Sequence, residues 1–512
     1  MGVTTARRTP AGLAFAGAVV AGVTVLPLVY LVLRAVGSSD PLALVGSERV
    51  VRFVWATLRL GVVVGALALF LGVGLAWLVE RTDLPGRRFL GVAAVLPLVV
   101  PSYVAALALK AAFGPAGLLA EIPGVIGFWG AATALGMSSY PYVLLMARAA
   151  LAAGDPALEE AARSLGDSRA RAFRRVLLPQ LRPAMAAGTL LVFLYVLSDF
   201  GAVSILQYDT LTRGIFLEYR SLSPDRSPAA VLGVVLVILT LVAITTERLA
   251  RGRTAPARAV AGAAPPIRVS LGRWRWVAAG GVVAVVAAGL GVPVGVLGYW
   301  SAVGSSRASA GGVLADAAMT SMLLAGAAAL VAVVAAVPVA LLAVRHRTRF
   351  ARAVETLSFS GYALPGLVIA LALVFFAAPY PLYQTLSLVV LAYVIRFLPE
   401  AIGSVRSSLG QVDPALEEVA RSLGRGRLAT TATVTLPLVR RGLLAGGALV
   451  FLTAMKELPA TLVLRPPGTD TLAVRVWTGA SEGLYAQAAP AALILVVVSA
   501  LVLWPLNWRG AR

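Results

Sequence analysis

The sequence predicts an all-α polytopic membrane protein, with about twelve transmembrane helices arranged in two duplicated six-helix halves. Of the 512 residues, 59% are apolar and only 13% are charged, whereas soluble domains carry about 25% charged residues. The apolar residues are gathered in long runs, and the second half of the chain repeats motifs of the first. This composition excludes a soluble enzyme, a disordered chain and a fibrous repeat.

The predicted spans are the apolar runs that reach the length needed to cross a bilayer, which is about 20 residues in a helix. The first run follows Arg7 and Arg8, but it is long for the apolar part of a signal peptide, so we expect it to be a retained helix. The twelve runs lie near residues 11–33, 53–79, 89–113, 124–147, 184–206, 228–246, 277–300, 316–344, 355–378, 382–404, 442–464 and 485–506.

The distribution of charge predicts the orientation in the membrane. The formal net charge is +21, and the basic excess lies in alternate loops between the apolar runs. Because Lys and Arg favour the cytoplasmic side, we expect both termini, residues 80–88 and residues 247–276 to be cytoplasmic. The partner of this basic chain is then the lipid bilayer, and we do not expect nucleic-acid binding. A cysteine placed at Ala257 should therefore resist an impermeant thiol reagent added outside.

An internal repeat divides the chain into two halves of parallel topology. Residues 155–166 read DPALEEAARSLG and residues 413–424 read DPALEEVARSLG, so the two segments differ at one position only. Residues 101–109 (PSYVAALAL) likewise resemble residues 365–373 (PGLVIALAL). We therefore expect a first half over 1–246, a cytoplasmic linker over 247–276 and a second half over 277–512.

Both near-identical segments lie in predicted cytoplasmic loops, and each has the pattern of a short helix. In the first, Asp155 suits the cap, Pro156 the first turn and Gly166 the end of the helix. Apolar residues recur at helical spacing, which predicts one apolar stripe in each loop; its members are Leu158, Ala161, Ala162 and Leu165, then Leu416, Val419, Ala420 and Leu423. A second short helix is expected to begin at Ser168 and to end near Pro179.

Two interpretations of these loops are open. Each helix could lie on the membrane surface or pack on its own bundle, or it could be a docking element for a partner. The loops have hardly diverged while the membrane sequence around them has, and this favours docking on two copies of one partner. In that interpretation Glu159 and Glu160 form a solvated or partner-facing surface.

The two loops resemble the EAA loop of ABC importer permeases, whose pattern is EAA, three residues, Gly, nine residues and I-x-L-P. Val replaces Ile in both copies, and Val419 stands where the family has Ala. The resemblance implies that each loop forms a coupling helix seated on an ATPase subunit. The residues that carry this role would be Glu160, Ala161, Ala162, Gly166, Leu178 and Pro179, then Glu418, Val419, Ala420, Gly424, Leu436 and Pro437.

Further segments are similar to those of ferric-iron importer permeases. They are residues 198–201 (SDFG), 393–400 (YVIRFLPE) and 456–466 (KELPATLVLRP). The resemblance implies a fused two-half permease for ferric iron, while thiamine, aminophosphonates and polyamines remain alternative substrates of the same class. A twelve-helix secondary transporter is an alternative from another class, and it would have no reason to keep the two loops alike.

The sequence excludes an ATP-hydrolysing site of the P-loop type in this chain. The only lysines are Lys110 and Lys456, and neither follows a glycine as a P-loop requires. The chain has no Cys and a single His, His346, which excludes thiolate and multi-histidine metal sites. We therefore expect no enzyme activity and no cofactor in this chain. The resemblance implies as partners two copies of an ABC ATPase subunit and a soluble substrate-binding protein on the outer face.

Two acidic residues fall inside predicted spans. Asp199 and Glu457 are aligned by the repeat, and each lies well inside an apolar run. Ionised acids at such depth usually face the bundle interior or a wet cavity, and carboxylates suit a hard cation such as iron(III). They are therefore candidate pathway residues, although Glu457 could instead pair with another helix. Arg396 and Glu400, four residues apart, are expected to form a structural pair of their own.

Overall fold

The protein is described here by a computed structural model that covers residues 10–38, 40–115, 117–119, 121–153, 156–221, 226–251, 268–304, 310–346 and 348–510. These residues form α-helices, shorter helical turns and the loops between them, and the single β-bridge that they contain joins Thr82 and Val269. This confirms the all-α prediction. Asp155, which was predicted to cap the first docking helix, and Ala257 lie outside the described residues.

The helices pack into two compact units. Unit 2 comprises residues 45–214, 238–308 and 476–512, and unit 1 comprises residues 1–44, 215–237 and 309–475. The chain passes from one unit to the other within α2 (Pro41–Gly46), α11 (Leu211–Arg220), α12 (Ser227–Arg251) and α24 (Leu472–Glu482).

Unit 2 is built around three long helices that pack on one another, α3, α6 and α9. Ser47 caps α3 by accepting a hydrogen bond from the Val50 N–H at 3.4 Å, and small residues such as Gly72 let α3 and α6 approach closely. Its helices are α3 (Glu48–Arg81), α4 (Arg87–Ala93), η1 (Leu96–Val99), α5 (Ser102–Phe113), α6 (Phe128–Ala153), α7 (Pro156–Ser164), α8 (Arg169–Ala172), η2 (Phe173–Leu177), α9 (Leu178–Ser198), α10 (Gly201–Ile205), η3 (Gly272–Trp274), α13 (Arg275–Val286), η4 (Ala287–Gly291), α14 (Val292–Gly304) and α25 (Tyr485–Gly510).

Unit 1 repeats this plan with α15, α19 and α22 at its centre. Ala-rich α15 contributes fully buried small residues, among them Ala325, Ala328 and Ala332. Its helices are α1 (Ala11–Val36), α15 (Ala310–Leu341), η5 (Leu342–His346), α16 (Arg349–Ser358), α17 (Ser360–Ala363), α18 (Gly366–Ala377), α19 (Leu386–Gly410), α20 (Pro414–Ser422), α21 (Arg427–Thr430), η6 (Thr431–Thr435), α22 (Leu436–Met455) and α23 (Pro459–Leu464).

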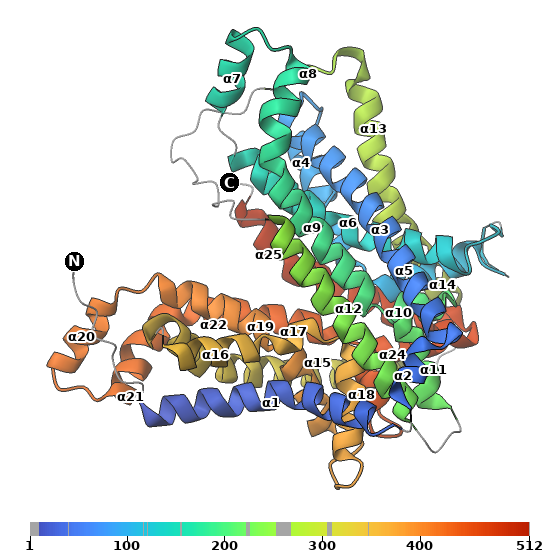
Figure 1. Ribbon diagram of the computed structural model, residues 1–512. Coiled ribbons are helices and arrows are strands. Elements are labelled where there is room, and N and C mark those ends of the chain that lie inside the picture. Colours follow the sequence, from blue (N-terminus) through green and yellow to red (C-terminus); the bar gives the residue numbers. More distant parts are fainter. Residues whose placement is uncertain are drawn as a thin grey trace. The chain divides into compact units, whose positions relative to one another are not determined.

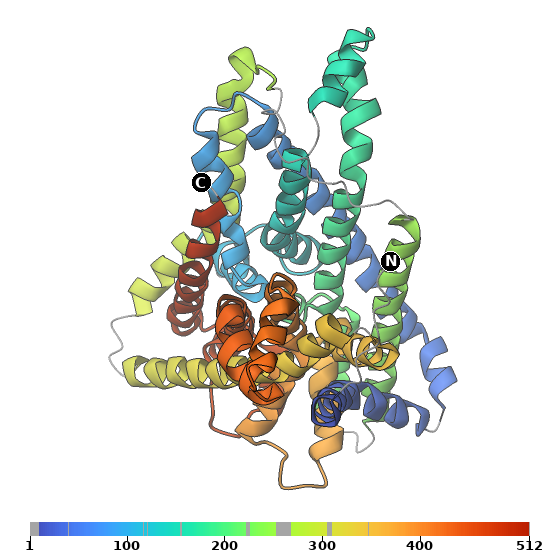
Figure 2. The same cartoon turned by 90° about the vertical axis from the view of Figure 1, so that its left-hand side faces the viewer.

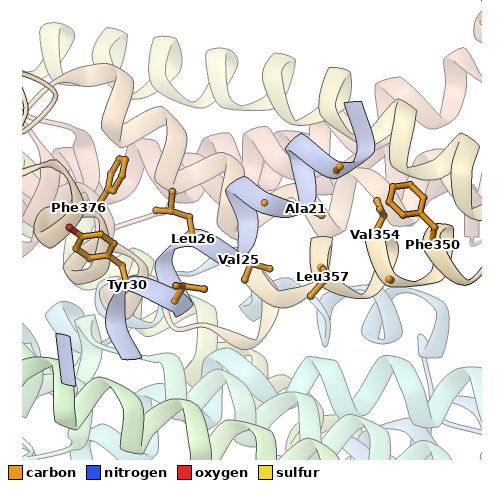
Figure 3. Close-up of a pocket in the computed structure, with 12 residues that line it drawn as sticks. Ala21, Val25, Leu26, Tyr30, Phe350, Val354, Leu357 and Phe376 are labelled. Carbon is orange, nitrogen blue, oxygen red and sulfur yellow. The ribbon is translucent and has the colours of Figure 1, made fainter. Parts of the chain in front are cut away.

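The compact units do not coincide with the two halves of the sequence, because each unit contains helices from both. In unit 1, α1 packs along α16 and α18, which follow it by more than 300 residues (Figures 1 and 2). Figure 3 shows the groove between them, where Tyr30 of α1 meets Phe376 of α18 with ring centroids 5.7 Å apart. In unit 2, α14 packs on α5 and α25. The division at residues 246 and 277 therefore describes the repeat and stays a prediction as a domain boundary.

Two of the predicted spans are bent. The run near 89–113 turns by 90° between residues 87–99 and α5, and the run near 355–378 turns by 103° between residues 349–362 and α18. Pro101 and Pro365 precede the helices that follow these turns, and proline cannot continue the preceding helix. Each of these two runs therefore forms two helices that meet at a sharp bend.

Eight helices among the described residues are long and apolar enough to cross a membrane, and up to ten if each bent pair counts as one span. Helices lie at all twelve predicted runs. The prediction of a polytopic membrane protein is therefore confirmed, while the number twelve stays a prediction.

The part of the predicted linker that the structure describes is attached to unit 2. The Val269 N–H donates to the Arg81 carbonyl at 2.7 Å, and the Leu271 N–H donates to the Asp83 carboxylate at 2.7 Å. This second hydrogen bond holds the pKa of Asp83 below its usual value. The end of the linker thus lies against the loop between α3 and α4.

Candidate functional site

The first near-identical loop forms a short helix with a tight end, as the sequence predicts. It is α7, and Gly166 beyond its C-terminus has φ +93°. The Asp167 N–H donates to the Ala162 carbonyl at 3.1 Å, and the Gly166 N–H to the Arg163 carbonyl at 3.0 Å. A left-handed residue with this pair of hydrogen bonds is a Schellman end, which favours glycine.

The second loop repeats this geometry in unit 1. Asp413 caps α20 by accepting a hydrogen bond from the Ala415 N–H at 2.9 Å. Gly424 has φ +85°, and the Arg425 N–H donates to the Ala420 carbonyl at 3.2 Å. In Figure 1, α7 lies at the end of unit 2 opposite α10, and α20 lies at the end of unit 1 opposite α18. The two docking helices, α7 and α20, are therefore equivalent parts of the two units.

Most of the predicted apolar stripe is exposed on both docking helices. The exposed fraction is 51% for Leu158 and 87% for Leu165 on the first, and 57% for Val419 and 77% for Leu423 on the second. Ala420 differs, since it is buried against its own unit. Exposed leucines beside a polar helix face are typical of a surface that another protein covers, and this favours docking over packing on the chain's own bundle.

The end of the first loop differs from the prediction of a separate second helix. The Ser168 hydroxyl accepts a weak hydrogen bond from the Arg171 N–H at 3.4 Å, as a cap would. The helix does not end near Pro179, however, because α8 continues through a π-helical turn, η2, into α9. Pro179 and Pro437 are the second residues of α9 and α22, the helices that follow such π-helical turns in the two units. Proline lacks the N–H that an α-helical hydrogen bond needs, and it is accommodated where the helix already widens.

Glu159 and Glu160 were expected to share one solvated surface, and this was wrong for Glu159. The Glu159 carboxylate pairs with Arg81, with 3.1 Å between Oε2 and Nη1. Its counterpart Glu417 pairs with Arg345, with 3.0 Å between Oε1 and Nη2. Glu160 and Glu418 are exposed, as a partner-facing role requires.

Asp199 lies at a break between helices rather than inside a continuous span. Helix α9 ends at Ser198, and Asp199 is 8% exposed. One carboxylate oxygen accepts a hydrogen bond from the Ala202 N–H at 3.0 Å at the start of α10, and the other accepts one from the Ser102 hydroxyl. The side chain therefore joins the bend before α5 to the break after α9.

Glu457 occupies the equivalent break in unit 1, between α22 and α23, and is 5% exposed. One of its oxygens accepts a hydrogen bond from the Ala460 N–H at 3.2 Å, and the other lies 3.4 Å from Nε of Arg396. The expected pairing of Arg396 with Glu400 was therefore wrong; Glu400 accepts a hydrogen bond from the Thr453 hydroxyl at 3.0 Å.

The carboxylates at the two breaks have different side-chain partners, a hydroxyl in unit 2 and a guanidinium in unit 1. Ser102 and Gly366 start α5 and α18, directly after the two matched prolines. In unit 2 the serine donates to Asp199. In unit 1 a Cβ at Gly366 would overlap both Arg396 and Glu457, so the absence of a side chain makes room for the ion pair. Ser102 was not among the predicted site residues, although its alignment with Gly366 is visible in the repeat.

No group of three or more His, Cys, Asp or Glu side chains that could hold a metal ion occurs among the described residues. The carboxylates of Asp199 and Glu457 each lie within their own unit, and each is engaged there.

Comparison with known proteins shows that the two repeats match the same family model. The model of the binding-protein-dependent transport system inner membrane component matches residues 66–251 and again residues 330–508. The chain is 37% identical over 485 residues to the Fe(3+)-transport system permease protein FbpB 2 of Haemophilus influenzae, covering 93% of this chain and 94% of that protein.

More distant relatives share all or part of this arrangement. The chain is 26% identical over 499 residues to the ferric transport system permease protein FbpB of Actinobacillus pleuropneumoniae, covering 91% of this chain and 72% of that protein. Over 182 residues it is 32% identical to a probable sulfate transport system permease protein cysT of Chlorokybus atmophyticus, covering 34% of this chain and 64% of that protein.

Proposed function

Because the chain belongs to the family of binding-protein-dependent transport system inner membrane components, we propose that it is the permease of an ABC importer for ferric iron. The observation that carries the proposal is the 37% identity, over nearly the whole of both chains, to an Fe(3+)-transport permease. Two copies of the family domain in one chain mean that a single polypeptide supplies both halves of the translocation pathway. The chain is a multi-pass protein of the inner membrane, with both termini in the cytoplasm.

The geometry of the docking helices supports the proposed partners. Both α7 and α20 present exposed leucines and an exposed glutamate, so each receives one copy of a separate ATPase subunit. ATP is hydrolysed in that subunit and not in this chain. A soluble substrate-binding protein delivers iron to the outer face, in keeping with the description of the family.

Iron is the cargo in this proposal and not a resident cofactor. Asp199 and Glu457 remain candidate pathway residues, since carboxylates are suitable ligands for a hard cation. Their present partners are a hydroxyl, backbone N–H groups and Arg396. A pathway role therefore requires that one of these contacts be exchanged during transport.

The alternatives are less well supported. The sulfate-permease relative matches about a third of this chain, whereas the iron-permease relatives match more than nine tenths. Family membership and the paired docking helices argue against a secondary transporter.

The test is ATP-driven uptake of radioactive iron(III) by reconstituted vesicles. The chain is co-expressed with its ATPase, and the soluble binding protein that co-purifies with it is added on the outer side. We expect uptake that requires ATP and the binding protein and that excess sulfate or thiamine does not reduce. Uptake of sulfate or thiamine in place of iron would refute the substrate, and a chain that neither binds an ATPase nor transports would refute the proposed function.

A further inference from the structure

The two consecutive glutamates of each docking helix point in different directions. Neighbouring residues on a helix are about 100° apart around its axis, so the pair cannot share one face. The side chains of Glu159 and Glu417 are each 15% exposed, whereas Glu160 and Glu418 are exposed. The second glutamate of each pair is exposed to solvent, and the first contacts the chain's own unit.

Each inward glutamate meets an arginine at the cytoplasmic end of a long membrane helix. Arg81 is the last residue of α3, and its side chain is only 3% exposed. Arg345 lies in the turn that continues α15, and its side chain is 13% exposed. A cation suits the C-terminal end of a helix, and an arginine so far out of water needs an anionic partner. Glu159 and Glu417 supply it.

The contact in unit 1 ties together more than two groups. The same Glu417 oxygen accepts hydrogen bonds from Nε and Nη2 of Arg345, at 3.1 and 3.0 Å, and from the Thr435 hydroxyl at 3.2 Å. Nη2 of Arg345 also donates to the Val412 carbonyl at 3.1 Å, just before α20 begins. One cluster therefore joins α15, the docking helix and the turn that leads into α22.

The pairing occurs twice with the same residue types. Arg81 and Arg345 are separated by the same interval as Pro101 and Pro365, which the repeat matches. The surrounding residues differ, since the position before the arginine is Glu80 in the first half and Val344 in the second. The same ion pair is thus present at equivalent places in two units whose neighbouring sequence has diverged, and each pair joins a docking helix to a central helix of its unit.

We propose that Arg81 and Arg345 are positioning residues for coupling: through Glu159 and Glu417 they fix α7 and α20 to the central helices, so that movement of the docked ATPase is transmitted into the membrane. This inference rests on the proposed function. Transmission of movement from the docked ATPase to the membrane helices needs a physical link between packed elements. Helices α3 and α15 are suitable because each packs on the other two central helices of its unit.

The test removes and then reverses the pair. Arg81→Met and Arg345→Met abolish the link, and the exchange of Arg81→Glu with Glu159→Arg restores it with reversed polarity. The matched controls break a neighbouring ion pair that does not touch a docking helix. Glu80→Gln, at the same end of α3, removes the counter-charge of Arg148, and Glu355→Gln removes that of Arg406 in unit 1.

The readout is the number of iron ions transported per ATP hydrolysed, measured on assembled complexes. A role in stability alone would reduce the amount of complex and leave this ratio unchanged. We expect the ratio to fall about tenfold in the methionine variants, within the usual range of coupling between sites. The exchange should recover it to within about threefold, since an arginine in the first turn of α7 is unfavourable to the helix dipole.

The outcomes separate this inference from the proposed function. If the unaltered chain neither binds an ATPase nor transports iron, the proposed function fails. If the unaltered chain transports iron and the methionine variants keep the same ratio, the positioning role alone is overturned. It is also overturned if the controls lower the ratio as much as the methionine variants do, or if the exchange variant assembles and does not recover.

Discussion

At the level of single residues, the glycine after each docking helix is required by backbone conformation and not by space. Gly166 and Gly424 have φ +93° and +85°, and a Cβ built on either would meet nothing within 4 Å. An L-residue in this conformation costs about 1–2 kcal/mol, with asparagine the usual exception. The free space around each glycine would therefore accommodate a large side chain, while the left-handed backbone conformation disfavours one that is branched at Cβ.

We expect Gly166→Val and Gly424→Val to lower iron uptake severalfold and Gly166→Asn to retain most of it. The valine variants fray the turn that sets the direction in which the chain leaves α7 or α20. Uptake and ATPase co-purification measure the effect, and Gly426→Ser, in the same loop and without a left-handed φ, is the control. Normal uptake by both valine variants would show that the turn is not needed for docking.

The two buried acids should respond differently to loss of charge. Glu457→Gln leaves Arg396 without its counter-charge, and removing one member of a buried ion pair costs about 3 kcal/mol or more. Asp199→Asn keeps an oxygen for the Ser102 hydroxyl or the Ala202 N–H, and we expect a loss of about 1 kcal/mol. Thermal unfolding in detergent compares the two variants.

Stability and pathway role can then be separated. Adding Arg396→Met to Glu457→Gln should restore much of the stability, because no buried charge is left unpaired. Because we expect Asp199→Asn to remain folded, its iron uptake measures the pathway role of Asp199. The double variant Asp199→Asn with Glu457→Gln tests the pathway role of both acids. Equal stability of the two single variants would contradict the ion pair described here, and unchanged uptake in the double variant would remove the pathway role.

At the level of helices, the central packing of unit 2 depends on the absence of side chains. A Cβ at Gly72 of α3 would lie 2.8 Å from the Leu144 nitrogen and 3.0 Å from the Tyr140 oxygen. These are backbone atoms of α6, and they cannot move aside without moving the helix. Gly74, two residues later on the same helix, has nothing within 4 Å.

We expect Gly72→Ala to destabilise the protein by about 1–3 kcal/mol, the range found for overpacking. Gly74→Ala should be neutral or stabilising, because alanine favours a helix over glycine by about 1 kcal/mol. Thermal unfolding of the two variants in the same detergent measures the difference. Equal melting temperatures would mean that α3 and α6 do not approach as closely as described.

The positions of the apolar spans and the two docking loops could be predicted from sequence, because local hydropathy and helix-end residues decide them. The directions in which the helices run, and the contacts between distant residues, could not be predicted. A run of apolar residues has the same average hydropathy whether or not it bends at Pro101 or Pro365. The Arg81–Glu159 pair was missed because 78 positions separate its members. Spacing of four residues suggested Arg396 with Glu400, but the break after α22 brings Glu457 to Arg396 instead.

For the whole molecule, the exchange of helices means that neither half of the sequence contains a complete unit. Leu31 of α1 is fully buried, and α1 packs on α16 and α18 of the second half. In unit 2, the indole N–H of Trp300 in α14 donates to the Ala111 carbonyl of α5 at 3.4 Å. Each half taken alone would expose the faces that these helices cover.

We expect residues 1–256 and 257–512, expressed separately, to aggregate or be degraded, and the same two fragments expressed together to assemble. Each fragment alone lacks partners for helix faces that are packed against small and aromatic side chains, and such faces do not match lipid as well as they match each other. Size-exclusion chromatography of tagged fragments in detergent measures the outcome, with the intact chain as the reference and co-expression as the control. If each half expressed alone ran as a single sharp peak and unfolded at the temperature of the intact chain, each half would fold alone and the exchanged helices would be dispensable.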